Sequence, residues 1–222
     1  MPGDGPIAIK AVVFDFDGLM FNTEEIFNRS GRELLRRRGL EMTPELLTLM
    51  MGRRADEAFP LMIAKLGLSE TAAELRAEER AIFQDMLWAH VAPMPGLFEL
   101  LAHIEGRALP KGVATSSRRP YIESVLRKFE LVERFDLLLT SEDVVEGKPH
   151  PEIYLTAASR LGVRPEEMLV LEDSEIGTRS AAAAGAVAVS IPHEHSRHHD
   201  FSSATFVAER LDDPQILRLL PI

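Results

Sequence analysis

Two carboxylates lie two residues apart in the stretch AVVFDFDGLMFNTEE, residues 11–25. Asp15 ends an apolar run, Asp17 follows it, and Gly18 comes next. Acidic side chains are rarely buried without a partner, and neighbouring carboxylates repel one another unless a cation lies among them. A hard divalent cation that prefers oxygen ligands, such as Mg²⁺, would relieve that repulsion. Because a carboxylate can attack phosphorus once the phosphate charge is neutralised, phosphoryl transfer is a chemistry that this pair could perform if further suitable residues gather around it.

A parallel β-sheet is the element expected to hold these residues in place. Short apolar runs are separated by helical segments, and the runs are AVVFDF at 11–16, GVAT at 112–115, FDLLLT at 135–140, MLVLED at 168–173 and AVAVSI at 186–191. Such alternation predicts β-α units and a parallel sheet with both faces covered by helices. The predicted fold class is therefore α/β, with a Rossmann-like core.

A helical insertion separates the first predicted strand from the others. Throughout residues 23–92, apolar residues recur at spacings of three and four, and no strand pattern is present. Proline and glycine in APMPG, residues 92–96, indicate the return to the core. We therefore expect an α/β catalytic core of residues 1–22 and 93–222, with an α-helical cap of residues 23–92.

Further polar residues follow the other predicted strands. Ligands of open parallel sheets bind at the carboxyl ends of the strands. Thr115 and Ser116 end the second run, Lys148 lies in the loop after the third, and Glu172 and Asp173 end the fourth. We expect all of them to converge with the first two carboxylates at one edge of the sheet.

Each residue type suits one part of phosphoryl transfer. Asp15 would be the nucleophile and would also bind the metal. Asp17 would protonate the leaving alcohol and then deprotonate the water that hydrolyses the intermediate. Thr115 and Lys148 would hold the phosphoryl oxygens. Glu172 and Asp173 would complete the metal site.

Four segments in this order resemble the signature motifs of the haloacid dehalogenase superfamily: DFDG, ATSS, GKPHPEIY and LEDSEIGTRSAAAAGA. More narrowly, the chain resembles the branch of phosphatases and β-phosphoglucomutases that carry a helical cap, and the resemblance extends from about residue 11 to 192. It implies a Mg²⁺-dependent phosphomonoester hydrolase that acts on a small phosphorylated metabolite through an aspartyl phosphate. It also implies that the cap closes over the site and selects the substrate.

The resemblance implies the same catalytic roles and adds detail to the metal site. Its ligands would be Asp15, Asp173 and the backbone carbonyl of Asp17. Glu172 would support the metal through its carboxylate or a water. The residues counted as metal-binding are therefore Asp15, Asp17, Asp173 and Glu172.

Three residues are candidates for substrate contacts outside the reacting group. By resemblance, Glu24 would face the substrate, and Arg53, in a cap loop after Gly52, would contact its non-reacting part. The alternative for Arg53 is a solvated charge at the start of a helix. Ser116 is compatible either with a substrate contact or with a helix cap.

Other members of the superfamily provide alternatives to a phosphatase. A sugar-phosphate mutase similar to β-phosphoglucomutase would return the phosphate to a bound sugar. Phe27 and Ala55, however, stand where such mutases have a histidine and an arginine. A phosphonate hydrolase would need a cap lysine, and Lys65 is not in a matching context. A non-catalytic regulatory module that binds phosphate would usually lack Asp15 or Asp17. A phosphatase is therefore favoured.

Composition limits the expected partners and location. The chain has 222 residues and a net charge of -10, and its acidic residues are spread along the sequence, which argues against a nucleic-acid-binding surface. The absence of cysteine excludes disulfides and thiolate metal sites. No signal peptide and no run of ~18 apolar residues is found, so we expect a cytoplasmic protein without a membrane segment. A monomer that binds a small phosphorylated metabolite is the default expectation.

Three clusters have simple structural interpretations. The arginines at 36–38 are predicted to be the solvated end of a helix. Trp88, Met50 and Met51 are predicted to lie in the core of the cap. The four histidines of PHEHSRHHD, residues 192–200, have a spacing that fits no standard metal site, so we expect a solvated loop that borders the mouth of the active site.

Overall fold

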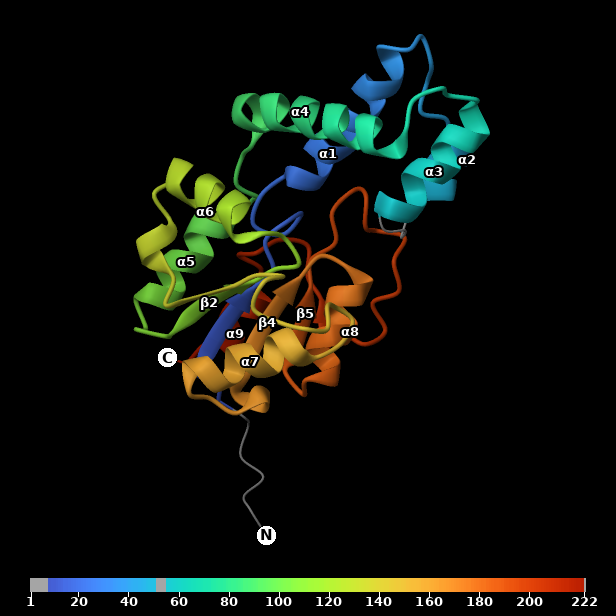
Figure 1. The fold of residues 1–222 in the computed structure, drawn as a ribbon. Coiled ribbons are helices and arrows are strands. Elements are labelled where there is room, and N and C mark those ends of the chain that lie inside the picture. Colours follow the sequence, from blue (N-terminus) through green and yellow to red (C-terminus); the bar gives the residue numbers. More distant parts are fainter. Residues whose placement is uncertain (1–7, 51–54, 222) are drawn as a thin grey trace. The chain divides into compact units, whose positions relative to one another are not determined.

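The computed structural model describes residues 8–50 and 55–221 (Figure 1). The chain forms two compact units. One consists of Met1–Asn22 and Pro93–Ile222, and the other of Thr23–Ala92. We call them the core unit and the helical unit.

The core unit contains a parallel sheet whose strand order is β3-β2-β1-β4-β5-β6. Its strands are β1 (Ala11–Phe14), β2 (Lys111–Ala114), β3 (Leu137–Leu139), β4 (Met168–Glu172), β5 (Val187–Ser190) and β6 (Phe206–Val207). The predicted α/β fold with a parallel sheet is therefore confirmed, and each predicted run contains a strand. The sequence did not predict β6, because two residues are too short to display an alternating pattern.

Helices cover both faces of this sheet. The core helices are α5 (Leu97–Glu105), α6 (Arg119–Lys128), α7 (Glu152–Leu161), α8 (Glu175–Ala183) and α9 (Pro214–Leu219), with short 3-10 turns at Val132–Arg134 and Pro165–Glu167. Figure 1 shows α7 and α8 in front of the sheet and α9 behind it. Strands buried on both faces need near-continuous apolar sequences, and all four residues of β1 are buried.

The helical unit contains α1 (Thr23–Arg36), α2 (Pro44–Met50), α3 (Ala55–Leu66) and α4 (Ala72–His90). Its apolar core joins buried residues of all four helices, among them Leu35, Leu46, Met62 and Ile82. Met50 packs against this core, as predicted, whereas Met51 lies outside the described residues. The prediction for Trp88 was wrong, because its side chain is 48% exposed. Leu87 is the buried residue of that turn, and the next residue of a helix points about 100° away from it.

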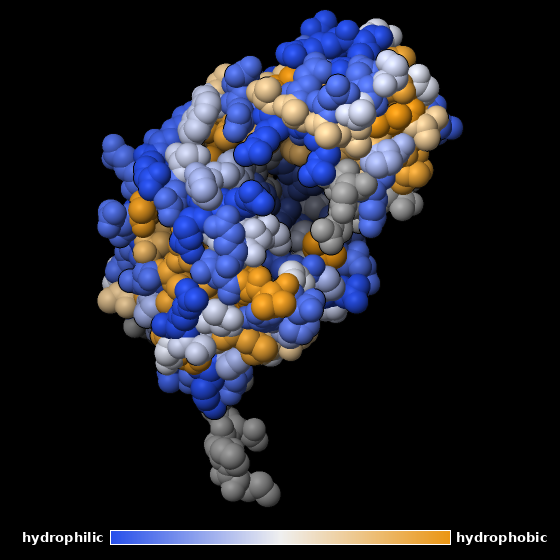
Figure 2. All heavy atoms as spheres, viewed as in Figure 1, coloured by the Kyte–Doolittle hydropathy of each residue, from blue (hydrophilic) through white to orange (hydrophobic). Residues whose placement is uncertain are grey.

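Most of the visible surface carries polar residues, with smaller groups of apolar residues among them (Figure 2). Within the described ranges, no helix combines the length and the apolar character needed to cross a membrane.

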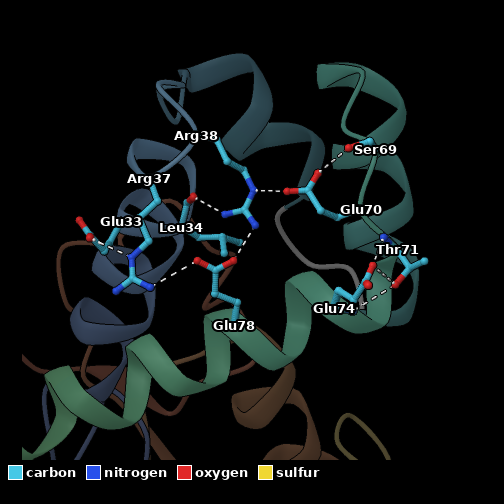
Figure 3. A network of polar contacts seen from close by, with 9 residues as sticks. All are labelled: Glu33, Leu34, Arg37, Arg38, Ser69, Glu70, Thr71, Glu74 and Glu78. Carbon is cyan, nitrogen blue, oxygen red and sulfur yellow. Dashed lines mark hydrogen bonds and ion pairs between the residues drawn. The ribbon is translucent and has the colours of Figure 1, made fainter.

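The arginines that follow α1 belong to an ionic network rather than to a fully solvated helix end (Figure 3). Arg38 donates to Glu70 at 2.8 Å, to Glu78 at 2.6 Å and to the carbonyl of Leu34 at 2.8 Å. Its side chain is only 16% exposed. The sequence-based interpretation was therefore wrong for Arg38, because acidic residues distant in sequence surround it. It holds for Arg36, whose side chain is 75% exposed.

Arg38→Met is expected to lower the free energy of unfolding by about 1 kcal/mol, because three directional hydrogen bonds in a network are lost. Arg36→Met is the matched control, and we expect little change in its stability because the Arg36 side chain, which pairs with Glu33, is 75% exposed. Urea titrations of both variants measure the difference. Equal midpoints would show that the network adds nothing to stability.

A buried acid joins α1 to α4. The Ser30 hydroxyl lies in hydrogen-bond contact with Glu79 and at 2.8 Å from the carbonyl oxygen of Phe27. A hydroxyl has one proton, so both contacts are hydrogen bonds at the same time only when the Glu79 carboxyl is protonated and donates. Burial raises the pKa of Glu79 above its ordinary value of 4.5, and the Ser30 hydrogen bond only partly opposes this.

Protonation of Glu79 therefore favours folding. With a pKa raised in the folded state, the stabilisation is complete below pH 4.5 and is lost as the pH rises through the raised value. Glu79→Gln, a permanent analogue of the neutral acid, is expected to be at least as stable as the parent at pH 7 and to flatten this dependence. Urea titrations between pH 4 and 8 test this, with Glu57→Gln on the exposed surface of α3 as control. A lower stability of Glu79→Gln at pH 7 would contradict it.

Candidate active site

The carboxyl ends of three neighbouring strands bring the predicted polar residues together. Asp15 follows β1, Thr115 follows β2, and Glu172 is the last residue of β4. The sheet hydrogen bonds continue past the strands, since Asp15 N donates to Leu171 O at 2.9 Å and Thr115 N donates to Leu139 O at 3.0 Å. The backbone thereby positions these side chains at one edge, where all are buried.

Lys148 connects the nucleophile candidate to β4. Its ammonium nitrogen Nζ donates to Asp15 Oδ1 at 2.5 Å, to Glu172 Oε1 at 2.6 Å and to Ala114 O at 3.0 Å. An ammonium has three hydrogens, and each has an acceptor here. The side chain is 4% exposed. Lys148 is therefore a buried cation that neutralises carboxylates and is not a surface lysine of a loop.

The pKa values of this pair reflect burial and charge together. Burial alone would lower the pKa of Lys148, but the carboxylates of Asp15 and Glu172 outweigh it and raise that pKa well above the ordinary value. Burial also raises the pKa of Asp15 well above its ordinary value, and the negative charges of Glu172 and Asp173 add to this while Lys148 opposes it. The arrangement thus contains more negative charge than one ammonium balances.

The acidic cluster suits a divalent cation. Asp15, Glu172 and Asp173 are all buried, and each offers an oxygen within 4.8 Å of the others. Lys148 is paired with the carboxylates of Asp15 and Glu172, and the third carboxylate, Asp173, adds further negative charge beside them. Carboxylate oxygens are the ligands that hard divalent cations prefer. Charge and donor type therefore both fit such an ion.

Glu172 is held by residues that the sequence analysis did not identify. Its Oε1 accepts from the Tyr154 hydroxyl at 2.6 Å in addition to Lys148, and its Oε2 accepts from the Ser174 hydroxyl at 3.0 Å. A Cβ at Gly177 would collide with this carboxylate, so only glycine fits there. Tyr154 is fully buried on α7 and lies in the same GKPHPEIY segment as Lys148, a signal that could have drawn attention to it.

Asp17 also has partners that the sequence analysis missed. The Ser117 hydroxyl donates to Asp17 Oδ2 at 2.6 Å, and the Tyr121 hydroxyl donates to Asp17 Oδ1 at 2.8 Å. Ser117 lies directly before the N-cap residue of α6 and Tyr121 lies in the first turn of this helix, so both hydroxyls come from its N-terminal end. These two bonds orient both oxygens of the carboxylate.

The threonine and serine of the ATSS segment have different environments. Thr115 is buried, and its Oγ1 accepts from the backbone N–H of Ser117 at 3.1 Å. It does not cap α6, whose N-cap residue is Arg118. Ser116 is exposed. Both follow β2 directly, so both lie at the edge where the carboxylates gather.

The predicted cap contacts belong to the other unit or to undescribed residues. Glu24 lies in the first turn of α1 with a partly exposed side chain. Arg53 lies outside the described residues. Phe27 is 53% exposed on α1, and its ring packs edge-on against Phe83 with 6.1 Å between centroids.

Of the histidine cluster, His193 lies at the site. Its Nε2 is 2.9 Å from Asp173 Oδ2. In the part of the chain that the structure describes, His195, His198 and His199 belong to no group of residues that could hold a metal ion. His193 follows β5 at its carboxyl end, and the rule that directed attention to the other strand ends could have found it.

The chain is similar to several known proteins. The family model described as haloacid dehalogenase-like hydrolase matches residues 12–191. Validoxylamine A 7'-phosphate phosphatase of Streptomyces hygroscopicus subsp. limoneus is 35% identical over 189 residues, which cover 84% of this chain and 87% of the relative. Phosphorylated carbohydrates phosphatase of Thermotoga maritima is 30% identical, covering 80% and 82%. The solved structure of CbbY from Rhodobacter sphaeroides with phosphate is 27% identical with a TM-score of 0.76, covering 92% and 96%.

Proposed function

The chain belongs to the haloacid dehalogenase-like hydrolases and is a phosphatase of small phosphorylated metabolites, and from this premise we propose a Mg²⁺-dependent reaction through an aspartyl phosphate on Asp15. The observation that carries the proposal is the buried contact of Lys148 with Asp15 and Glu172 beside Asp173. This contact brings a carboxylate, an ammonium and an acidic cluster together at the carboxyl ends of the strands, which supports the roles proposed for them.

Asp15 performs the covalent step. One carboxylate oxygen attacks phosphorus, a bond forms between this oxygen and phosphorus, and the bond from phosphorus to the ester oxygen breaks. Lys148 stays within reach of the developing negative charge and stabilises it. Thr115, buried beside the nucleophile at the end of β2, donates its hydroxyl to a phosphoryl oxygen, and Ser116 contributes a substrate contact at the same edge.

Asp17 moves the protons. It donates a proton to the leaving alkoxide, which departs as the alcohol. The resulting carboxylate then takes a proton from the water that attacks the aspartyl phosphate, so that inorganic phosphate leaves and Asp15 is restored. The hydroxyls of Ser117 and Tyr121 hold this carboxylate in one orientation between the two steps.

Mg²⁺ would be held by Asp15, Asp173 and the backbone carbonyl of Asp17, with support from Glu172. When bound, it supplies positive charge that neutralises the phosphoryl oxygens and the acidic cluster. The lysine and tyrosine bonds to Glu172 support an indirect role for this residue, because they already occupy Oε1.

The helical unit serves as the cap that selects the substrate. Glu24 and Arg53 are the proposed contacts to its non-reacting part. Carbohydrate phosphates are the proposed substrate class, since one of the relatives compared above is named phosphorylated carbohydrates phosphatase. We propose that the protein is a cytoplasmic monomer that binds neither nucleic acid nor membranes.

Phosphate release from a panel of sugar phosphates and other small phosphomonoesters tests the proposal. We expect release with Mg²⁺ and none after chelation. Conversion of one sugar phosphate isomer into another without phosphate release would instead identify a mutase. Release that persists in chelator would contradict the metal requirement.

A further inference from the structure

A histidine outside the four motifs contacts the proposed metal ligand. Nε2 of His193 lies 2.9 Å from Oδ2 of Asp173, and the two side chains are 11% and 4% exposed. Both come from the carboxyl ends of neighbouring strands, Asp173 after β4 and His193 after β5. The backbone of His193 belongs to the loop after β5, but its imidazole is largely buried against the acidic cluster and is not solvated like the exposed His198.

The hydrogen bond at Nδ1 of His193 determines which of the two ring nitrogens carries the hydrogen. The backbone N–H of His195 donates to His193 Nδ1 at 3.2 Å. Nδ1 is thereby an acceptor, so in the neutral imidazole Nε2 holds the hydrogen and donates it to Asp173. The contact with Asp173 is a directed hydrogen bond whose polarity is set by the backbone.

The turn after β5 holds the ring in place. The His193 N–H donates to the hydroxyl of Ser196 at 3.1 Å, and its carbonyl accepts from Ser196 N and Arg197 N, both at 3.0 Å. Ser196 is fully buried. These bonds close a compact turn, so the imidazole is oriented before any ligand binds.

Gly18 leaves the space in which the histidine and the aspartate meet. A Cβ at this residue would lie 2.5 Å from Asp173 Oδ2 and 2.7 Å from His193 Nε2. The backbone of the DFDG turn therefore passes directly beside this hydrogen bond. Any larger residue at position 18 would separate the pair.

We propose that His193 is a positioning residue that orients the Asp173 carboxylate for the divalent cation. The proposal deepens the function above and rests on Asp173 as a metal ligand. Carboxylates that bind metals are held in turn by hydrogen bonds, and loss of such a partner typically costs about 10–100-fold in metal affinity or activity. Of the four histidines in the cluster, only the first has this role.

Two substitutions separate the hydrogen bond from the volume of the ring. His193→Gln keeps an N–H donor at similar reach, whereas His193→Met has a similar length without a donor. His198→Met, at an exposed histidine of the same cluster, is the control. Mg²⁺ affinity is measured by calorimetry without substrate, and phosphate release at varied Mg²⁺ is measured separately.

We expect His193→Met to weaken Mg²⁺ binding about 10–100-fold, His193→Gln to recover most of the loss, and His198→Met to match the parent. The same order is expected for the Mg²⁺ concentration that gives half-maximal activity. Parent-like Mg²⁺ affinity in folded His193→Met, or equal losses in the Gln and Met variants, overturns the inference even if the enzyme is a phosphatase. If His193→Met weakens Mg²⁺ binding as expected but the parent protein hydrolyses no ester, the proposed function is refuted and the inference about His193 stands.

Discussion

Asp15→Asn is expected to reduce phosphate release by on the order of 10⁴-fold or more, because an amide is a poor nucleophile and the covalent step has no alternative acceptor. The fold should survive. The buried carboxylate adds to the repulsion with Glu172 and Asp173, and its raised pKa shows that the charged form is disfavoured. Removing that charge therefore should not lower the melting temperature.

Phosphate release and thermal unfolding are measured on the same preparation of Asp15→Asn. Asp136→Asn, a change of the same type at a residue that accepts from the backbone N–H of Lys111 at 2.9 Å, is the control for activity. Substantial turnover by folded Asp15→Asn would refute Asp15 as the nucleophile.

Lys148→Met is expected to have the largest effect on stability. Its side chain is nearly isosteric, but two carboxylates lose their shared cation, and an uncompensated buried charge costs roughly 3–5 kcal/mol. Activity should fall as well, by about 10²–10³-fold, as when one donor to a developing oxyanion is removed. Urea titrations and turnover of the folded fraction provide the two measurements.

Lys10→Met is the matched control, because this lysine also pairs with a glutamate but is 59% exposed. Its stability should change little, since exposed ion pairs contribute little. If Lys148→Met unfolds at the same urea concentration as Lys10→Met, the buried pairing does not stabilise the fold. If it also retains full activity, the proposed role of Lys148 is refuted.

Much of the fold was predictable because strands and helices follow from patterns of neighbouring residues. The apolar runs around Val13 and Val170 are continuous, as strands buried on both faces require, and the structure confirms the parallel sheet. The helical spacing of residues 23–92 likewise matches α1 to α4. Trp88 was misplaced because that prediction rested on the burial tendency of tryptophan, and residue type alone does not determine which side of a helix faces the core.

The candidate site was predictable in part, for a related reason. Residues directly after strands share one edge of a parallel sheet, so Asp15, Thr115 and Glu172 could be grouped without coordinates. The hydrogen-bond partners of the site carboxylates could not be predicted in this way. Tyr121 and Ser117 contact Asp17 across separations of 104 and 100 residues, and no local pattern encodes such a contact.

The sequence by itself determined which residue types lie at the carboxyl ends of the strands, since their order along the chain and the rules of parallel sheets are enough for that. Only the tertiary structure decided how each carboxylate is held: Asp17 by two hydroxyls, Glu172 by a lysine and a tyrosine, and Asp173 by a histidine. The physical reason is that a hydrogen bond requires the donor–acceptor distance to be correct to within a few tenths of an ångström. That distance is set by the packing of helices and turns that are distant in the sequence.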